Sequence, residues 1–251
     1  MMNLVRKLKE SKKSLQSKDW IYVMPIILDF SVLFIHRYIL KRNYIHKGKV
    51  IDFNIGIISS PPSISYIFKD YPHPLMDIIS QDTNIFTLGL LVLFTIIMSF
   101  INGAYLALLN KDEKIKIKNF IKEGNKFWDK FFIYRLIVNI IILYGLKYNI
   151  NPIILILINI IMTYIPYSII CEEGNIFFII KKSIQVLFNN ILDTIKLLVL
   201  CAGLFFIIYL PTKYIFISTT IEILFFIMLI SYFGVIINKT ILEIYKQSSS
   251  L

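Results

Sequence analysis

The chain has 251 residues, of which 57% are hydrophobic and only 17% charged, and its formal net charge is +11 at pH 7. This apolar fraction and a mean hydropathy of +0.69 exclude an ordinary soluble domain and predict an integral membrane protein. The basic residues gather beside apolar runs, which fits contact with anionic lipid headgroups and argues against a nucleic-acid partner. Apolar runs recur along almost the whole length, so we expect one membrane domain over residues 1–251.

The amino-terminal segment, residues 1–19, holds six Lys or Arg and has Leu4, Leu8 and Leu15 at helical spacing. This pattern predicts a basic interfacial helix on the cytoplasmic side. The apolar run that follows has aromatic flanks and no small-residue cleavage site, so we expect it to be retained as a first span over residues 20–40. Residues 41–84 contain four prolines and several polar residues, which predicts a long extracytoplasmic loop.

Five further apolar segments complete the expected fold, an all-α polytopic helical bundle with six transmembrane helices and amphipathic interfacial helices. The second span is expected at residues 85–109 and ends in a cluster of small residues that favours close helix packing. The other four spans are expected at residues 131–148, 152–171, 191–210 and 221–237, and the last is expected to be followed by a short polar tail. Amphipathic surface helices are expected before the third and the fifth span.

The orientation is predicted by the basic residues, eight of which lie in residues 111–135 between two apolar segments. With six spans and both termini in the cytoplasm, 19 of the 27 Lys and Arg residues lie on the cytoplasmic side. Five basic residues between positions 37 and 49 oppose this assignment. Ile, Lys, Asn and Phe abound while Ala occurs three times, which indicates an AT-rich bacterial genome. We therefore expect a multi-pass protein of the bacterial cytoplasmic membrane with both termini inside.

A resemblance rests on the run YIPYSIICEEGNIFFIIKKSIQVLFNNILDTIKLL, residues 164–198. It contains an acidic turn followed by a basic residue, a serine and an asparagine before the fifth span: Glu172, Glu173, Lys182, Ser183, and Asn189 or Asn190. In this layout residues 85–240 resemble the broad group of uncharacterised bacterial membrane proteins that includes the YciC-like family and the membrane domain of glycerophosphodiester phosphodiesterases. The chain departs from that group in its 44-residue outer segment and in lacking a soluble phosphodiesterase domain. The resemblance implies a membrane domain with an accessory role, and no catalytic residue carries over.

One candidate site is polar and intramembrane. Asp29 lies nine residues into the first span, about 14 Å deep at about 1.5 Å per residue, where a lone carboxylate is costly. With His36 seven residues further along the same face, it could form a proton or cation site. Alternatively, Asp29 pairs structurally with Arg135 or Asn139, or is simply protonated.

The second candidate site is a basic surface on the two amphipathic helices. It consists of the lysines that we expect to face the cytoplasm or the lipid headgroups: Lys118, Lys122, Lys126, Lys181 and Lys182. Anionic headgroups of the bilayer, or a cytoplasmic protein partner, would contact this surface.

The sequence has no HExxH, GxSxG, Walker or paired-carboxylate motif, and its two cysteines lack CxxC spacing. We therefore expect no enzyme activity and no catalytic, cofactor-binding or metal-binding residues. Two functions follow as hypotheses. The chain is a non-enzymatic accessory, scaffolding or regulatory membrane component, or it is the permease subunit of an ABC-type exporter with a separate ATPase, in which residues 111–130 form the coupling helix.

Overall fold

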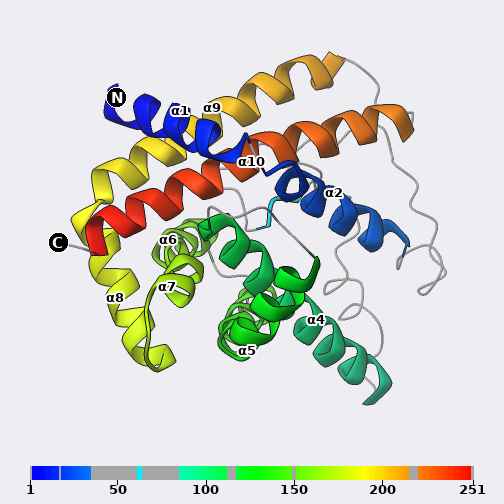
Figure 1. Cartoon of the computed structure of the whole chain (residues 1–251). Helices are drawn as coiled ribbons and strands as arrows, with labels where there is room; N and C mark the ends of the chain where they lie inside the picture. The colour runs from blue at the N-terminus through cyan, green and yellow to red at the C-terminus, as the bar shows by residue number, and fades with distance from the viewer. Residues whose placement is uncertain are drawn as a thin grey trace.

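The computed structural model describes residues 2–16, 18–34, 61–63, 85–111, 117–148, 151–214 and 220–249, and every regular element in these ranges is an α-helix (Figure 1). This confirms the predicted all-α class. The helices are α1 (Met2–Leu15), α2 (Asp19–Phe34), α4 (Ile85–Asn110), α5 (Ile117–Lys147), α6 (Pro152–Met162), α7 (Ile165–Cys171), α8 (Ile176–Asn189), α9 (Ile191–Tyr214) and α10 (Thr220–Ser249). His36, the end of the expected first span and all of the predicted outer loop except residues 61–63 lie outside the described residues.

Within the described residues the predicted spans are almost entirely helical, but these residues do not support a count of six spans. Two segments are long and apolar enough to cross a membrane, Leu91–Asn110 of α4 and Leu224–Ser249 of α10. A third is obtained if α8 and α9, which meet at an angle of 82°, are taken together as one broken span. The chain therefore has two or three candidate membrane-spanning helices by length and composition.

The helix boundaries correct the sequence prediction in two places. Residues 152–171 form two helices, α6 and α7, because Pro166 lies in the first turn of α7, where proline is well tolerated but cannot continue a preceding helix. The second correction concerns the carboxyl end, where a short polar tail was expected after residue 237. Instead, α10 continues to Ser249.

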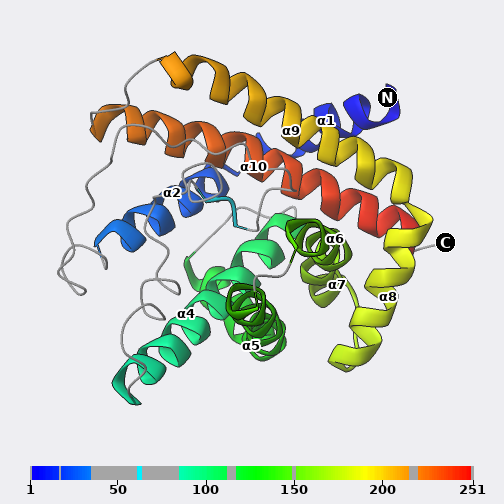
Figure 2. The ribbon, with the colours of Figure 1, turned by 180° about the vertical axis from the view of Figure 1, so that it is seen from behind.

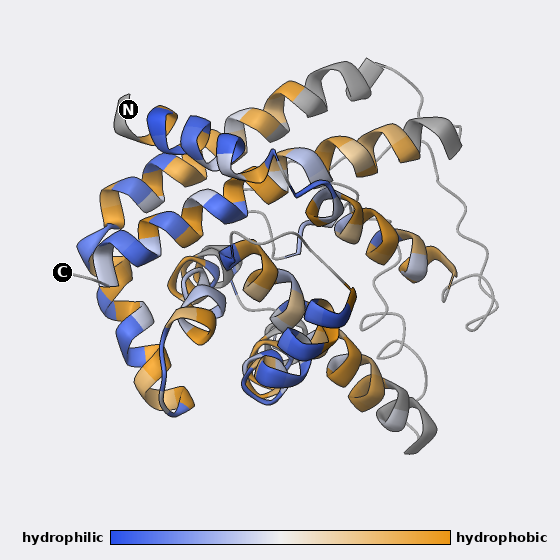
Figure 3. Ribbon diagram, viewed as in Figure 1, coloured by the Kyte–Doolittle hydropathy of each residue, from blue (hydrophilic) through white to orange (hydrophobic). Residues whose placement is uncertain are grey.

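The helices α4 and α10 share a division into an exposed half and a buried half. In α4 the exposed apolar residues lie towards the amino end, for example Val92 and Ile97, whereas residues 104–109 are all buried. In α10 Phe225 is exposed and residues 235–242 are all buried. Figure 3 shows that apolar residues predominate in the part of α10 towards its amino end, whereas polar residues are frequent in its carboxyl-terminal half. The buried halves meet at the centre of the molecule.

The amino-terminal helix α1 lies beside α9 and α10 in both views of the molecule (Figures 1 and 2). Leu4 and Leu15 are buried, and the Lys7 ammonium is 3.6 Å from the Asp193 carboxylate of α9. The leucine stripe that predicted an interfacial helix is therefore packed against protein. The opposite face of α1 is polar and exposed.

The pair α4 and α5 is packed closely at two glycines. A Cβ atom added at Gly103 would lie 3.1 Å from Cβ of Phe127, and one added at Gly124 would lie 2.5 Å from the ring of Phe100. Small residues at these positions let the two helices approach. The cluster of small residues at the end of the predicted second span thus marks a real helix contact.

Candidate functional site

The four residues of the predicted intramembrane polar site are not joined by contacts in the described part of the chain. Asp29 is 3% exposed and accepts a hydrogen bond from Ser63 Oγ at 2.6 Å. Asn139 on α5 is buried and donates to Thr95 Oγ1 of α4 at 3.3 Å. Among the described residues no hydrogen bond or ion pair links Asp29 to Arg135 or Asn139. His36 cannot be placed, because it lies outside these residues.

Arg135 is the remaining member of that set. Its side chain is partly buried on α5, and Nε is buried without a hydrogen-bond partner. Within the described ranges no carboxylate forms an ion pair with it. A buried guanidinium nitrogen without an acceptor is costly, about 1–3 kcal/mol.

The first helix of the predicted basic surface is the amino-terminal half of α5, and it has three distinct faces. The first face is buried and includes Glu123, Gly124 and Phe127. The second is apolar but exposed, and it contains Ile117, Ile121 and Trp128. The third carries the exposed lysines Lys118, Lys122 and Lys126. An ordinary amphipathic helix on a soluble core has no second face of this kind.

The second helix, α8, repeats this arrangement. Ile179, Ser183, Val186 and Leu187 are buried. The opposite surface exposes three large aromatic side chains beside the predicted lysines: Phe177 (79%), Phe178 (50%) and Phe188 (67%). Lys181 is exposed and Lys182 is partly exposed. In a helix at a membrane surface, exposed aromatic residues beside lysines can enter the headgroup region while the lysines remain in water.

The start of α8 is built by Gly174 and Asn175. Gly174 has φ +126°, a conformation that side chains disfavour, and the Asn175 side chain accepts a hydrogen bond from Phe178 N at 2.9 Å as the helix N-cap. The end of α8 is fixed by Asn190, whose Nδ2 donates to Val186 O at 2.8 Å. The direction of α8 relative to the next helix is therefore set by local hydrogen bonds rather than by a flexible linker.

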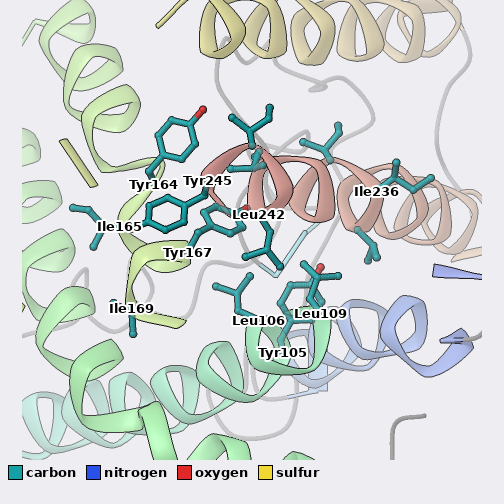
Figure 4. Close-up of a cluster of buried hydrophobic side chains, with 14 of the residues drawn as sticks. Tyr105, Leu106, Leu109, Tyr164, Ile165, Tyr167, Ile169, Ile236, Leu242 and Tyr245 are labelled. Atoms are coloured by element: carbon teal, nitrogen blue, oxygen red, sulfur yellow. The ribbon is translucent and has the colours of Figure 1, made fainter. Parts of the chain in front are cut away.

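A cluster of tyrosines, which we call the tyrosine junction, joins α4, α7 and α10; its members are Tyr105, Tyr164, Tyr167 and Tyr245. All four are at most 2% exposed. Figure 4 shows their side chains among the apolar residues of the three segments. This cluster lies between the buried carboxyl-terminal halves of α4 and α10.

The tyrosine hydroxyls take part in buried hydrogen bonds. Tyr167 donates to Asn238 Oδ1 at 2.9 Å, and Asn238 Nδ2 donates to Tyr105 at 3.3 Å. The Tyr245 hydroxyl donates to Glu172 Oε1 at 2.9 Å and lies 2.8 Å from Ser168 Oγ. Glu172 belongs to the acidic turn singled out in the sequence, so this turn is tied to α10 by a hydrogen bond.

Basic residues gather at the carboxyl end of α4. Lys239 is 2% exposed, donates to Leu109 O at 3.2 Å and pairs with Glu243 at 2.9 Å. Lys18 donates to the carbonyl of Lys111, and the Lys111 ammonium is 2.7 Å from the buried Glu123 carboxylate. Positive charge at a helix carboxyl end is favourable, since the last carbonyls are not bonded within the helix.

These groups are hydrogen bonded to one another, which suits holding helices together. In the described ranges no three His, Cys, Asp or Glu side chains lie close enough to hold a metal ion, and Cys171 and Cys201 form no disulfide. The tyrosine junction was not predicted from the sequence, because residues 238–249 were interpreted as a polar tail. The helical spacing of Ile237, Ile241 and Tyr245 could have indicated the buried face of a helix in this segment.

Comparisons of the chain with protein-family models, with curated proteins and with solved structures find no match. The resemblance to the YciC-like group therefore stays a prediction. Of the residues that carry it, Glu172 bonds Tyr245 and Asn190 caps α8, whereas Glu173 and Asn189 are exposed. Ser183 is fully buried, and no hydrogen-bond partner is found for its hydroxyl within the described residues.

Proposed function

We propose that the chain is a non-enzymatic, multi-pass integral membrane protein with an accessory, scaffolding or regulatory role. The observation that carries this proposal is the three-faced character of α5 and α8, each of which has a buried face, an exposed apolar face and a face with lysines. The helix α8, and the amino-terminal part of α5 where it enters the bilayer, are suited to contact the membrane surface and to present positive charge there. The working surface of the protein, by which we mean the surface that contacts lipid headgroups or a partner, then consists of five lysines: Lys118, Lys122, Lys126, Lys181 and Lys182.

A topology of six spans with both termini in the cytoplasm is part of this proposal. Its support is the shared polarity of α4 and α10, which both run from an exposed amino-terminal half into the buried centre, as expected if both enter from the outer side. The packing of α1 on α10 supports placing both termini on one side.

The alternative function is the permease subunit of an ABC-type exporter, with residues 111–130 as the coupling helix. Residues 117–130 form the first part of α5, which continues without a break to Lys147. Recovery of an ATPase in equal amount, by pull-down of the full chain in mild detergent, would decide for the exporter.

The test of the accessory role compares two triple variants of equal charge change. In one, Lys118, Lys122 and Lys126 of α5 are replaced by Gln; in the other, Arg6, Lys9 and Lys13 of α1 are replaced. All six residues are exposed. The measured quantity is the salt concentration at which the protein dissociates from a stoichiometric cytoplasmic partner or from anionic bilayers. We expect this concentration to be lower for the α5 variant than for the α1 variant. Equal behaviour of the two variants would refute the assignment of the working surface to α5.

A further inference from the structure

The starting observation is that the Arg135 guanidinium has no anionic partner among the described residues. Its Nε is buried and makes no hydrogen bond, and no described Asp or Glu pairs with the side chain. The residue as a whole is only partly buried. A cation in these surroundings is expected to have an anionic partner that comes from outside the chain.

The neighbours of Arg135 along α5 indicate what kind of partner this is. Trp128 precedes Arg135 by seven residues and Phe132 by three, so both share its face of the helix. The Trp128 and Phe132 rings are 6.3 Å apart, and Trp128 is 40% exposed. The exposed apolar residues Ile117 and Ile121 continue the same stripe. The anion must therefore approach along an open apolar and aromatic surface, which suits a lipid better than a small soluble ion.

The expected depth of Arg135 agrees with this. If α5 enters the bilayer at Phe131, Arg135 lies four residues further, about 6 Å below that point. An arginine at that depth extends its side chain back to the phosphate layer, and the planar guanidinium fork matches two phosphate oxygens. Tryptophan is enriched at the same level of the membrane.

We propose that Arg135 binds the phosphate of an anionic phospholipid in the cytoplasmic leaflet, with Trp128 and Phe132 packed against the glycerol and upper acyl chain. The exposed lysines on the adjacent face of α5 add positive potential that favours anionic over zwitterionic lipid. This inference rests on the proposed function, since it requires α5 to enter the membrane.

The experiment measures the melting temperature of the purified full chain in nonionic detergent after addition of phosphatidylglycerol, phosphatidylcholine or inorganic phosphate. We expect phosphatidylglycerol to raise the melting temperature most. Half-maximal stabilisation of Arg135→Gln should need at least about tenfold more of this lipid, because a hydrogen bond to a charged group is lost. Arg135→Lys should retain part of the effect, because lysine keeps the positive charge but lacks the planar guanidinium that can bind two phosphate oxygens. The control is Arg6→Gln on α1, where the side chain is 74% exposed, and it should behave as the wild type.

Three results would overturn the proposal: equal stabilisation by the two lipids, equal stabilisation by inorganic phosphate, or an unchanged response of Arg135→Gln. If Arg135→Gln does not fold, the comparison of wild type with Arg135→Lys still decides, since equal lipid requirements contradict bidentate binding. Cysteine labelling at the two ends of α5 reports separately whether this helix crosses the membrane. A crossing helix without lipid selectivity refutes only the present inference, whereas a helix that does not cross refutes the proposed topology.

Discussion

Asp29 illustrates how the contacts of one residue change its interpretation. The sequence left open a proton or cation site, a structural pair with Arg135 or Asn139, or a protonated carboxyl group. In the structure, Ser63 from the predicted outer loop donates a hydrogen bond of 2.6 Å to the carboxylate. A carboxylate contacted by a hydroxyl from another segment suits a role in tethering that segment to α2. This favours the structural alternative over the proton site, and both can be tested at this position.

The first prediction concerns the stability of Asp29 variants. Asp29→Asn keeps an acceptor for Ser63 and should retain most of the stability, whereas Asp29→Leu leaves polar groups unsatisfied and should cost about 1–3 kcal/mol. The measurement is the melting temperature of the purified protein in detergent. Normal melting of both variants, together with loss of any transport or partner function in both, would instead favour the proton site.

The second prediction concerns the tyrosine junction. Asn238→Leu removes the amide that bonds both Tyr105 and Tyr167, so two buried hydroxyls lose a partner, and we expect a loss of about 2–4 kcal/mol. Asn189→Leu is the matched control, because Asn189 is exposed at the end of α8, and it should change stability by less than about 0.5 kcal/mol. Equal melting temperatures for the two variants would contradict a structural role of Asn238.

At the scale of single elements, the sequence predicted helix positions well, because apolar periodicity and charge reveal which segments are helical. It predicted helix ends less well. Pro166 divides one expected span into α6 and α7, and a segment with Asn238, Lys239 and Glu243 continues α10. Those polar residues are accommodated by partners from distant segments, such as Tyr167 and Leu109, and a single sequence does not show such partners.

The third prediction tests how α8 begins. Gly174 has φ +126°, so Gly174→Ala should destabilise the protein by about 1 kcal/mol or more. The control is Gly203→Ala in α9, where a Cβ would meet no atom within 4 Å and alanine favours helix by up to about 1 kcal/mol. The two variants should shift the melting temperature in opposite directions. A stabilising effect of Gly174→Ala would show that the left-handed turn before α8 does not form.

At the scale of the whole molecule, hydropathy does not distinguish burial in protein from burial in lipid. The carboxyl-terminal half of α4 is apolar because it packs around the tyrosine junction, whereas its amino-terminal half is apolar and exposed. A span assigned from hydropathy combines both kinds of segment. The class of protein could therefore be predicted from composition, but the number of crossings could not be obtained from apolar length alone.

The fourth prediction tests the topology with one helix. Lys118 and Tyr148 lie at opposite ends of α5 and its adjoining turn, 30 residues apart, and Tyr148 is 56% exposed. At about 1.5 Å per residue this separation is about 45 Å, which exceeds the thickness of the hydrocarbon core. In a variant with both native cysteines replaced by Ala, we expect Tyr148→Cys to react with an impermeant thiol reagent in intact cells, and Lys118→Cys to react only after the cells are opened.

Ser249→Cys provides the control for the carboxyl terminus, and it should follow Lys118→Cys because α1 and α10 pack together and both termini are proposed to be cytoplasmic. The buried residue Thr240 supplies the unreactive reference, since Thr240→Cys should stay unlabelled in intact and in opened cells. Labelling of Ser249→Cys in intact cells would refute the proposed orientation. Labelling of Lys118→Cys and Tyr148→Cys from the same side would show that α5 does not cross the membrane, which would refute the proposed topology.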